Sequence, residues 1–65
     1  MSTFEASARR EGKHWVVTVE GVGVTQARSH GEAQEMAEDL VAVMTEQARG
    51  EFAVNVEVAP DEVPA

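Results

Sequence analysis

The stretch Ser29–Gly50 reads SHGEAQEMAEDLVAVMTEQARG and predicts one amphipathic helix. At about 100° per residue, its apolar side chains fall in one arc of about 160°. That arc contains Ala33, Met36, Ala37, Leu40, Val41, Val43, Met44 and Ala48. The opposite arc is polar, and only Ala42 breaks the division. A helix with one apolar face needs an apolar surface to cover it, so the rest of the chain is expected to supply that surface.

Residues that typically begin and end a helix occur at both ends of this stretch. Ser29 suits the N-cap position, and Glu32, three residues later, completes a capping box. Gly50 can adopt the left-handed conformation that ends a helix. We therefore expect the helix to begin directly after Ser29 and to end at Arg49.

The remaining apolar residues alternate with polar ones, which is typical of half-buried strands. Four such segments occur, at Thr3–Arg9, His14–Glu20, Val22–Arg28 and Phe52–Val58. Turn signals at Glu11-Gly12 and at Gly21 separate the first three. The side chains expected to face the helix are Phe4, Ala6, Trp15, Val17, Val19, Val22, Val24, Phe52, Val54 and Val56.

The order of segments predicts an α+β domain of the type β-β-β-α-β. Three strands form an antiparallel meander, and the helix packs on one face of the sheet. The fourth strand follows a helical crossover, so it can pair parallel at the edge of the first strand. Residues 1–58 form this single domain, and residues 59–65 (APDEVPA) are expected to be a flexible acidic tail.

One helix covers only one face of the sheet, so the second face and the edge of the third strand are expected to remain open for association. Its expected residues are Glu5, Ser7, Arg9, Val16, Thr18, Glu20, Thr25, Ala27, Asn55 and Glu57. A chain of 65 residues buries only about 60% of its unfolded surface, so we expect a homodimer.

Composition narrows the possible environments and partners. The chain has no cysteine, no apolar stretch long enough for a bilayer and no signal-peptide core, which favours a cytoplasmic protein. Its formal net charge is −7, from twelve acidic and five basic residues. This charge argues against direct nucleic-acid binding and favours either a basic protein partner or solubility alone.

No group of residues indicates catalysis, a metal or a cofactor. His14 and His30 have no ligand spacing, and Gly21-Val22-Gly23 does not precede a helix as a phosphate loop would. Glu35, Glu38 and Asp39 lie on the polar arc of the helix, where carboxylates are solvated. We therefore expect a non-catalytic protein without cofactors.

Three short motifs carry a family resemblance. They are Phe4-x-Ala6-x-Ala8, then Gly12-x-x-Trp15-Val16-Val17-Thr18-Val19, then Val24-Thr25-Gln26-Ala27-Arg28-Ser29-x-x-Glu32-Ala33. Over residues 3–58 this pattern resembles the HicB-like antitoxin domain. The resemblance implies a partial ribonuclease-H-like sheet without nuclease carboxylates. It also implies binding to a small basic mRNA-cleaving toxin of the HicA type.

Two features depart from that family. The link Glu20–Gly23 is shorter than the proline-rich loop of typical members, which weakens any toxin contact that this loop makes. No DNA-binding segment follows the domain before Ala65, so self-repression is not expected.

The residues expected to contact a partner follow from the open face and the polar arc of the helix. Glu5, Glu20 and Glu57 are the first choices, with Val16 as an apolar anchor and Glu35 and Asp39 as second choices. The alternative is a self-associating structural or regulatory domain, or a remnant with an unrelated protein partner.

Overall fold

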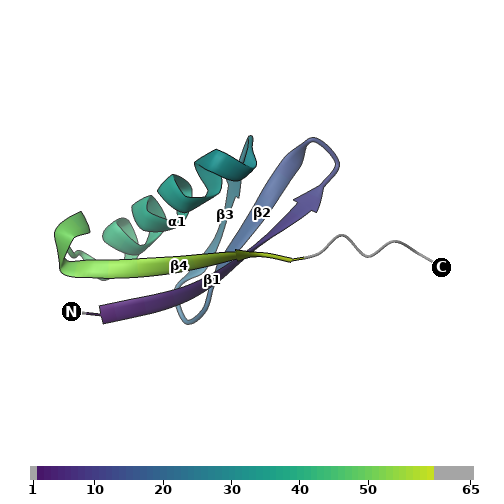
Figure 1. The fold of residues 1–65 in the computed structure, drawn as a ribbon. Coiled ribbons are helices and arrows are strands. Elements are labelled where there is room, and N and C mark those ends of the chain that lie inside the picture. The colour runs from purple at the N-terminus through teal and green to yellow at the C-terminus, as the bar shows by residue number, and fades with distance from the viewer. Residues whose placement is uncertain (1, 60–65) are drawn as a thin grey trace.

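The computed structural model describes residues 2–59, and its elements follow the order β-β-β-α-β (Figure 1). Their bounds are β1 Ser2–Glu11, β2 His14–Val19, β3 Gly23–Ala27, α1 His30–Thr45, the 3₁₀ turn η1 Arg49–Glu51 and β4 Phe52–Val58. The predicted α+β class is confirmed. Ala59 N donates to Ala8 O at 2.8 Å, and the rest of the expected tail, residues 60–65, lies outside the described residues.

The four strands form one mixed sheet in the order β3-β2-β1-β4. β1 pairs antiparallel with β2, β2 pairs antiparallel with β3, and β4 pairs parallel with β1. The predicted meander and the predicted edge position of the fourth strand are therefore confirmed. Figure 1 shows α1 lying across one face of this sheet. Within residues 2–59, no helix is both long and apolar enough to cross a membrane.

The core between α1 and the sheet consists mainly of alanines and valines. Its buried members are Ala6, Ala8, Val17, Val19, Ala27, Ala33, Ala37, Val41, Phe52 and Val54. Small side chains on both layers allow the helix to approach the strands closely, and the valines fill the remaining space. Phe4 and Phe52 close one end of the core with an edge-to-face contact, at 6.1 Å between ring centroids.

The buried face of α1 differs from the predicted arc. Ala33, Ala37 and Val41 are buried, but Val43 and Met44 are 69% and 59% exposed. The buried side is centred on the small residues, so the helix is rotated away from Val43 and toward Ala42, which packs against the core. Met44 is exposed for a second reason. Leu40 already lies over Gly23, the first residue of β3, so the next turn of the helix extends past that strand.

The start of α1 follows the prediction, whereas its end does not. Glu32 N donates to Ser29 Oγ at 3.2 Å, which confirms the N-cap. The Glu32 carboxylate accepts from Arg28 N at 3.5 Å rather than from Ser29 N. The helix ends at Thr45, and Glu46 adopts the left-handed conformation with φ 55°. The predicted end near Gly50 was wrong because residues 46–51 turn back so that Phe52 pairs with Ser2.

The third strand faces the opposite way from the prediction. Val24, expected in the core, is 60% exposed, whereas Ala27, expected on the open face, is buried. Val19 pairs with Gly23, so three residues separate the paired positions of β2 and β3, whereas Val24 would share the face of Val19 only if this number were even. Directly paired residues share a face, and Val19 faces the helix. Gly23, Thr25 and Ala27 therefore face the helix as well, and Val24 faces away.

Candidate functional site

The face of the sheet opposite α1 is the candidate site, and we call it the open face. Its side chains come from alternate positions of all four strands and of the turn after β2. They are Thr3, Glu5, Ser7, Arg9, Glu11, His14, Val16, Thr18, Glu20, Val24, Gln26, Ala53, Asn55 and Glu57. In Figure 1, no other described element covers this face. The predicted uncovered second face is thus present, with Val24 and Gln26 in place of Thr25 and Ala27.

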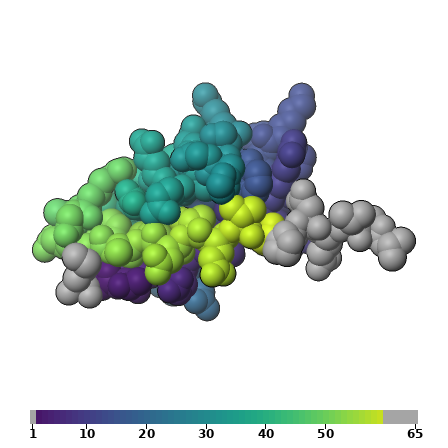
Figure 2. All heavy atoms as spheres, viewed as in Figure 1, coloured from purple at the N-terminus to yellow at the C-terminus, as the bar shows by residue number. Residues whose placement is uncertain are grey.

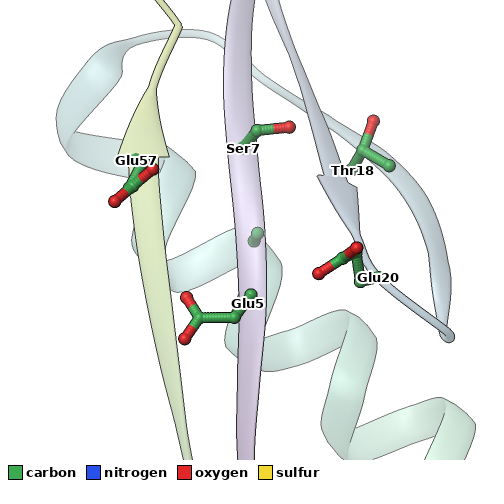
Figure 3. A pocket seen from close by; sticks show the side chains of 6 residues that line it. Glu5, Ser7, Thr18, Glu20 and Glu57 are labelled. Atoms are coloured by element: carbon green, nitrogen blue, oxygen red, sulfur yellow. The ribbon is translucent and has the colours of Figure 1, made fainter.

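Three glutamates gather on the open face, and we call Glu5, Glu20 and Glu57 the acidic cluster. They line an open cavity of about 250 Å³ together with Ala6, Ser7 and Thr18. Figure 3 shows the labelled side chains projecting from β4, β1, β2 and the turn after β2, with α1 behind the sheet. The sequence therefore predicted three residues that the fold brings together.

The strand register explains why these glutamates are neighbours. Glu20 N donates to Glu5 O at 2.9 Å, which fixes the turn after β2 beside β1. Glu57 pairs with Ser7, and Ser7 pairs with Thr18 on its other side. Short side chains at the centre leave space, so the cavity lies between the three carboxylates.

Few neighbouring groups neutralise the negative charge of the acidic cluster. Asn55 Nδ2 donates to Glu5 Oε1 at 3.3 Å, and this amide carries no charge. Within residues 2–59, all ion pairs are formed by Arg49, which lies next to β4 on the helix side of the molecule. Arg9 lies on the same face toward the β1–β2 tip but forms no ion pair with these glutamates, so the three carboxylates produce a negative potential around the acidic cluster.

The chemistry available to the acidic cluster is that of solvated carboxylates. The buried residues among 2–59 include no polar or charged side chain, and no group of His, Asp or Glu in this range has metal-binding geometry. Carboxylates that remain in water bind guanidinium and ammonium groups by charge-assisted hydrogen bonds. The geometry thus fits recognition of arginine and lysine side chains.

Apolar side chains flank the acidic cluster on the β2–β3 side. Val16 is half-buried, and Val24, which pairs with Thr18, is exposed. Val16 is the predicted apolar anchor, whereas Val24 was predicted to face the helix, because the side on which Val24 lies depends on the length of the β2–β3 connection. Gly21 is the residue that could have indicated the length of this connection. Its φ of 77° suits a turn in which Val22 N donates to Val19 O at 3.1 Å.

The second-choice residues Glu35 and Asp39 belong to a different surface. Both lie on α1, which is on the other side of the sheet from the acidic cluster. Asp39 Oδ1 accepts from Arg49 Nη2 at 3.1 Å, and Arg49 Nη1 lies 3.8 Å from Glu38 Oε1. The helix acids and the acidic cluster therefore do not form one binding surface.

A second open cavity, of about 470 Å³, lies where β3 leads into α1. It is lined by His14, Gln26, Ala27, Arg28, Glu32 and Met36. The other histidine, His30, packs its ring against Trp15 at 5.7 Å between centroids, so the two histidines do not share a site.

No family model, curated protein or solved structure matches this chain. Its function is therefore inferred from the open face and from the resemblance in the sequence.

Proposed function

We propose that this chain is a non-catalytic interaction module that binds and masks a small basic protein through the acidic cluster. The observation that carries the proposal is the convergence of Glu5, Glu20 and Glu57 on a sheet face that no other described element covers. The chain as a whole has a formal charge of −7, so its field attracts a basic partner before contact.

The open face has the two components that a protein interface needs. The acidic cluster supplies charge-assisted contacts, which orient the partner and select for arginine and lysine. Val24 and Val16 supply apolar contact area beside it, and apolar area gives affinity that charge alone does not. A basic protein with an exposed aliphatic or aromatic side chain beside its cationic residues fits this arrangement.

The specific partner that we propose is an mRNA-cleaving toxin of the HicA type. Support comes from the motif resemblance over residues 3–58 and from the β-β-β-α-β order that this resemblance implies. An RNA-cleaving protein presents a cationic surface to its substrate, because RNA carries one phosphate charge per nucleotide. An acidic module that covers such a surface blocks access of the RNA.

The alternative is self-association through the open face, and the acidic cluster disfavours it. Stacking two such faces brings six glutamates together while removing water from between them. Like charges that lose solvent repel strongly, so this arrangement is unfavourable near neutral pH. The open face therefore fits a basic partner better than a second copy.

The test is co-expression with the product of the neighbouring reading frame in the native operon. We expect a small basic protein that co-purifies with the chain and that arrests growth when expressed alone. The triple variant Glu5→Gln, Glu20→Gln, Glu57→Gln should bind it about 10- to 100-fold more weakly, corresponding to about 0.5–1 kcal/mol per lost ion pair.

The control carries the same charge change on α1, as Glu35→Gln, Glu38→Gln, Asp39→Asn. It should bind within about threefold of the unmodified chain, since its acids lie on the other side of the sheet. A larger loss in the α1 variant than in the open-face variant would assign the interface to the helix. Absence of any small basic protein in the complex would remove the proposed function.

A further inference from the structure

We infer that two copies of this chain join edge to edge through β4, antiparallel about a two-fold axis at Val56. The two four-stranded sheets then form one continuous sheet. This inference does not depend on the proposed function, because it uses the edge of β4 and leaves the open face uncovered.

The edge of β4 presents backbone groups that β1 does not use. Ala59 N donates to Ala8 O, so the N–H of residue 59 points toward β1. Backbone groups of a strand alternate in direction, which means that those of Phe52, Val54, Val56 and Val58 point away from β1. Along this edge the strand offers both donors and acceptors to a further strand.

Only part of this edge is already occupied. Gln34 Nε2 reaches from α1 and donates to Val54 O at 2.8 Å. Among residues 2–59, no hydrogen bond occupies the edge-facing groups of Val56 and Val58. Figure 2 shows β4, in yellow-green, along the front of the molecule next to α1.

The other edge of the sheet is a poorer template. Glu20 N bonds to β1, so by the same alternation Val17 and Val19 bond to β3. Gly23, Thr25 and Ala27 then face β2, and only Val24 and Gln26 of this five-residue strand present free backbone groups. β4 is longer, has seven residues, and carries a single charged side chain, Glu57.

The sequence of β4 is complementary to itself in one register. With Val56 on the two-fold axis, Val54 lies opposite Val58 of the second copy, and Asn55 lies opposite Glu57 of the second copy. Valine pairs and an amide opposite a carboxylate are favourable cross-strand pairs.

The neighbouring registers are less favourable. An axis at Glu57 places two carboxylates opposite each other, which is destabilising. An axis at Asn55 places Glu57 of one copy opposite Ala53 of the other, so the carboxylate has no amide partner across the pair. In either register Val54 O, which accepts from Gln34 Nε2, accepts a second hydrogen bond, which the two lone pairs of a carbonyl oxygen allow.

This pairing also covers an exposed apolar side chain. Val58 is 41% exposed at the end of β4. In the proposed register it lies opposite one valine of the second copy and diagonal to another. Both copies carry a formal charge of −7, so the association is weak at low ionic strength and strengthens when salt screens the repulsion.

Engineered disulfides test the register directly, because the chain contains no cysteine. The double variant Asn55→Cys, Glu57→Cys should oxidise to a covalent dimer whose linked peptides join position 55 to position 57. Each single variant should remain a monomer under the same conditions. A covalent dimer of Glu57→Cys alone or of Asn55→Cys alone would overturn the proposed register. If the variants have native circular-dichroism spectra and none of them forms a covalent dimer, the association itself is overturned.

Sedimentation equilibrium of uncrosslinked protein provides the second test. At about 0.5 M NaCl we expect a concentration-dependent rise from 7.0 kDa toward twice that mass. Val58→Lys should abolish the rise, because a charge at the edge blocks strand addition. The matched control Val43→Lys, which also changes an exposed valine, should not. Equal effects of the two substitutions, or a 7.0 kDa species at every concentration, would refute the β4 contact.

Discussion

At the scale of single residues, alanine lies where α1 comes closest to the sheet. Ala33 and Ala37 are buried on the helix, opposite a sheet that contributes Ala6 and Ala8. Larger side chains at these positions would push the layers apart. The largest fully buried side chains are Val17, Val19 and Val41, so the valines provide most of the apolar volume. In a domain this small, each of them carries a large share of the stability.

Val41 and Val43 therefore give a direct test of the helix face. Val41→Ala should lower the free energy of unfolding by about 2–3 kcal/mol, because it removes two buried methyl groups and leaves a cavity. Val43→Ala should change it by less than about 0.5 kcal/mol, since Val43 is 69% exposed. Both substitutions change helix propensity equally, so the difference reports burial. Urea titration followed by the fluorescence of Trp15, the single tryptophan, measures it.

At the scale of elements, the connections determine which way each strand faces. The β2–β3 connection contains Gly21 at φ 77°, and the connection after α1 contains Glu46 at φ 55°. Gly50, in contrast, does not have a positive φ and lies within η1. Glycine is required only where φ is positive, so the two glycines differ in importance although both have open space around the Cα.

Gly21→Ala should destabilise the fold by about 1–2 kcal/mol, because alanine is strained in the left-handed region. Gly50→Ala should change the stability by less than about 0.5 kcal/mol, as no atom lies within 4 Å of the added Cβ. The same urea titration compares the two variants. If Gly50→Ala were the more destabilising substitution, Gly50 rather than Glu46 would end the helix.

The predictable part of the fold is the part with unambiguous local patterns. β1 and β4 alternate cleanly between apolar and polar residues, so their inward faces and the position of the acidic cluster follow from the sequence. β3 reads Gly-Val-Thr-Gln-Ala, which has no strong alternation, and its facing depends on a one-residue difference in the preceding loop. The prediction that Val24 faces the helix was wrong because of that single residue in the loop.

The face of α1 was harder to predict for a different reason. The apolar arc spans about 160°, and Ala42 lies outside it, so the sequence alone allows more than one rotation of the helix toward the sheet. Packing selects the rotation that places Ala33, Ala37 and Val41 against the sheet, because small residues permit the closest contact. Hydrophobicity predicts the large side chains Val43 and Met44 to be buried, whereas packing leaves them exposed.

At the scale of the whole molecule, the charges are segregated. Four of the five cationic side chains, Arg9, Arg10, Lys13 and Arg28, lie at the β1–β2 tip or where β3 leads into α1. These two places are adjacent, because Trp15 pairs with Ala27 and His14 shares a cavity with Arg28. The acidic cluster and the later acids of α1, Glu38 and Asp39, lie away from this region, in which Glu11 is the single acid of the β1–β2 tip. A basic partner is therefore steered away from the tip, and from the end of the open face that carries Arg9, toward the acidic cluster.

This charge distribution predicts opposite salt responses for the two proposed associations. Binding of the basic partner should weaken between about 0.05 and 0.5 M NaCl, because salt screens the attraction to the acidic cluster. Self-association through β4 should strengthen over the same range, because salt screens the repulsion between two chains that each carry a formal charge of −7. Calorimetric titration of the partner measures the binding constant of the complex, and sedimentation of the chain alone measures the self-association constant. Salt-independent partner binding would mean that apolar contacts such as Val24 dominate the interface rather than Glu5, Glu20 and Glu57. A self-association that weakens with salt would mean that ionic contacts, which β4 does not offer, hold the two copies together.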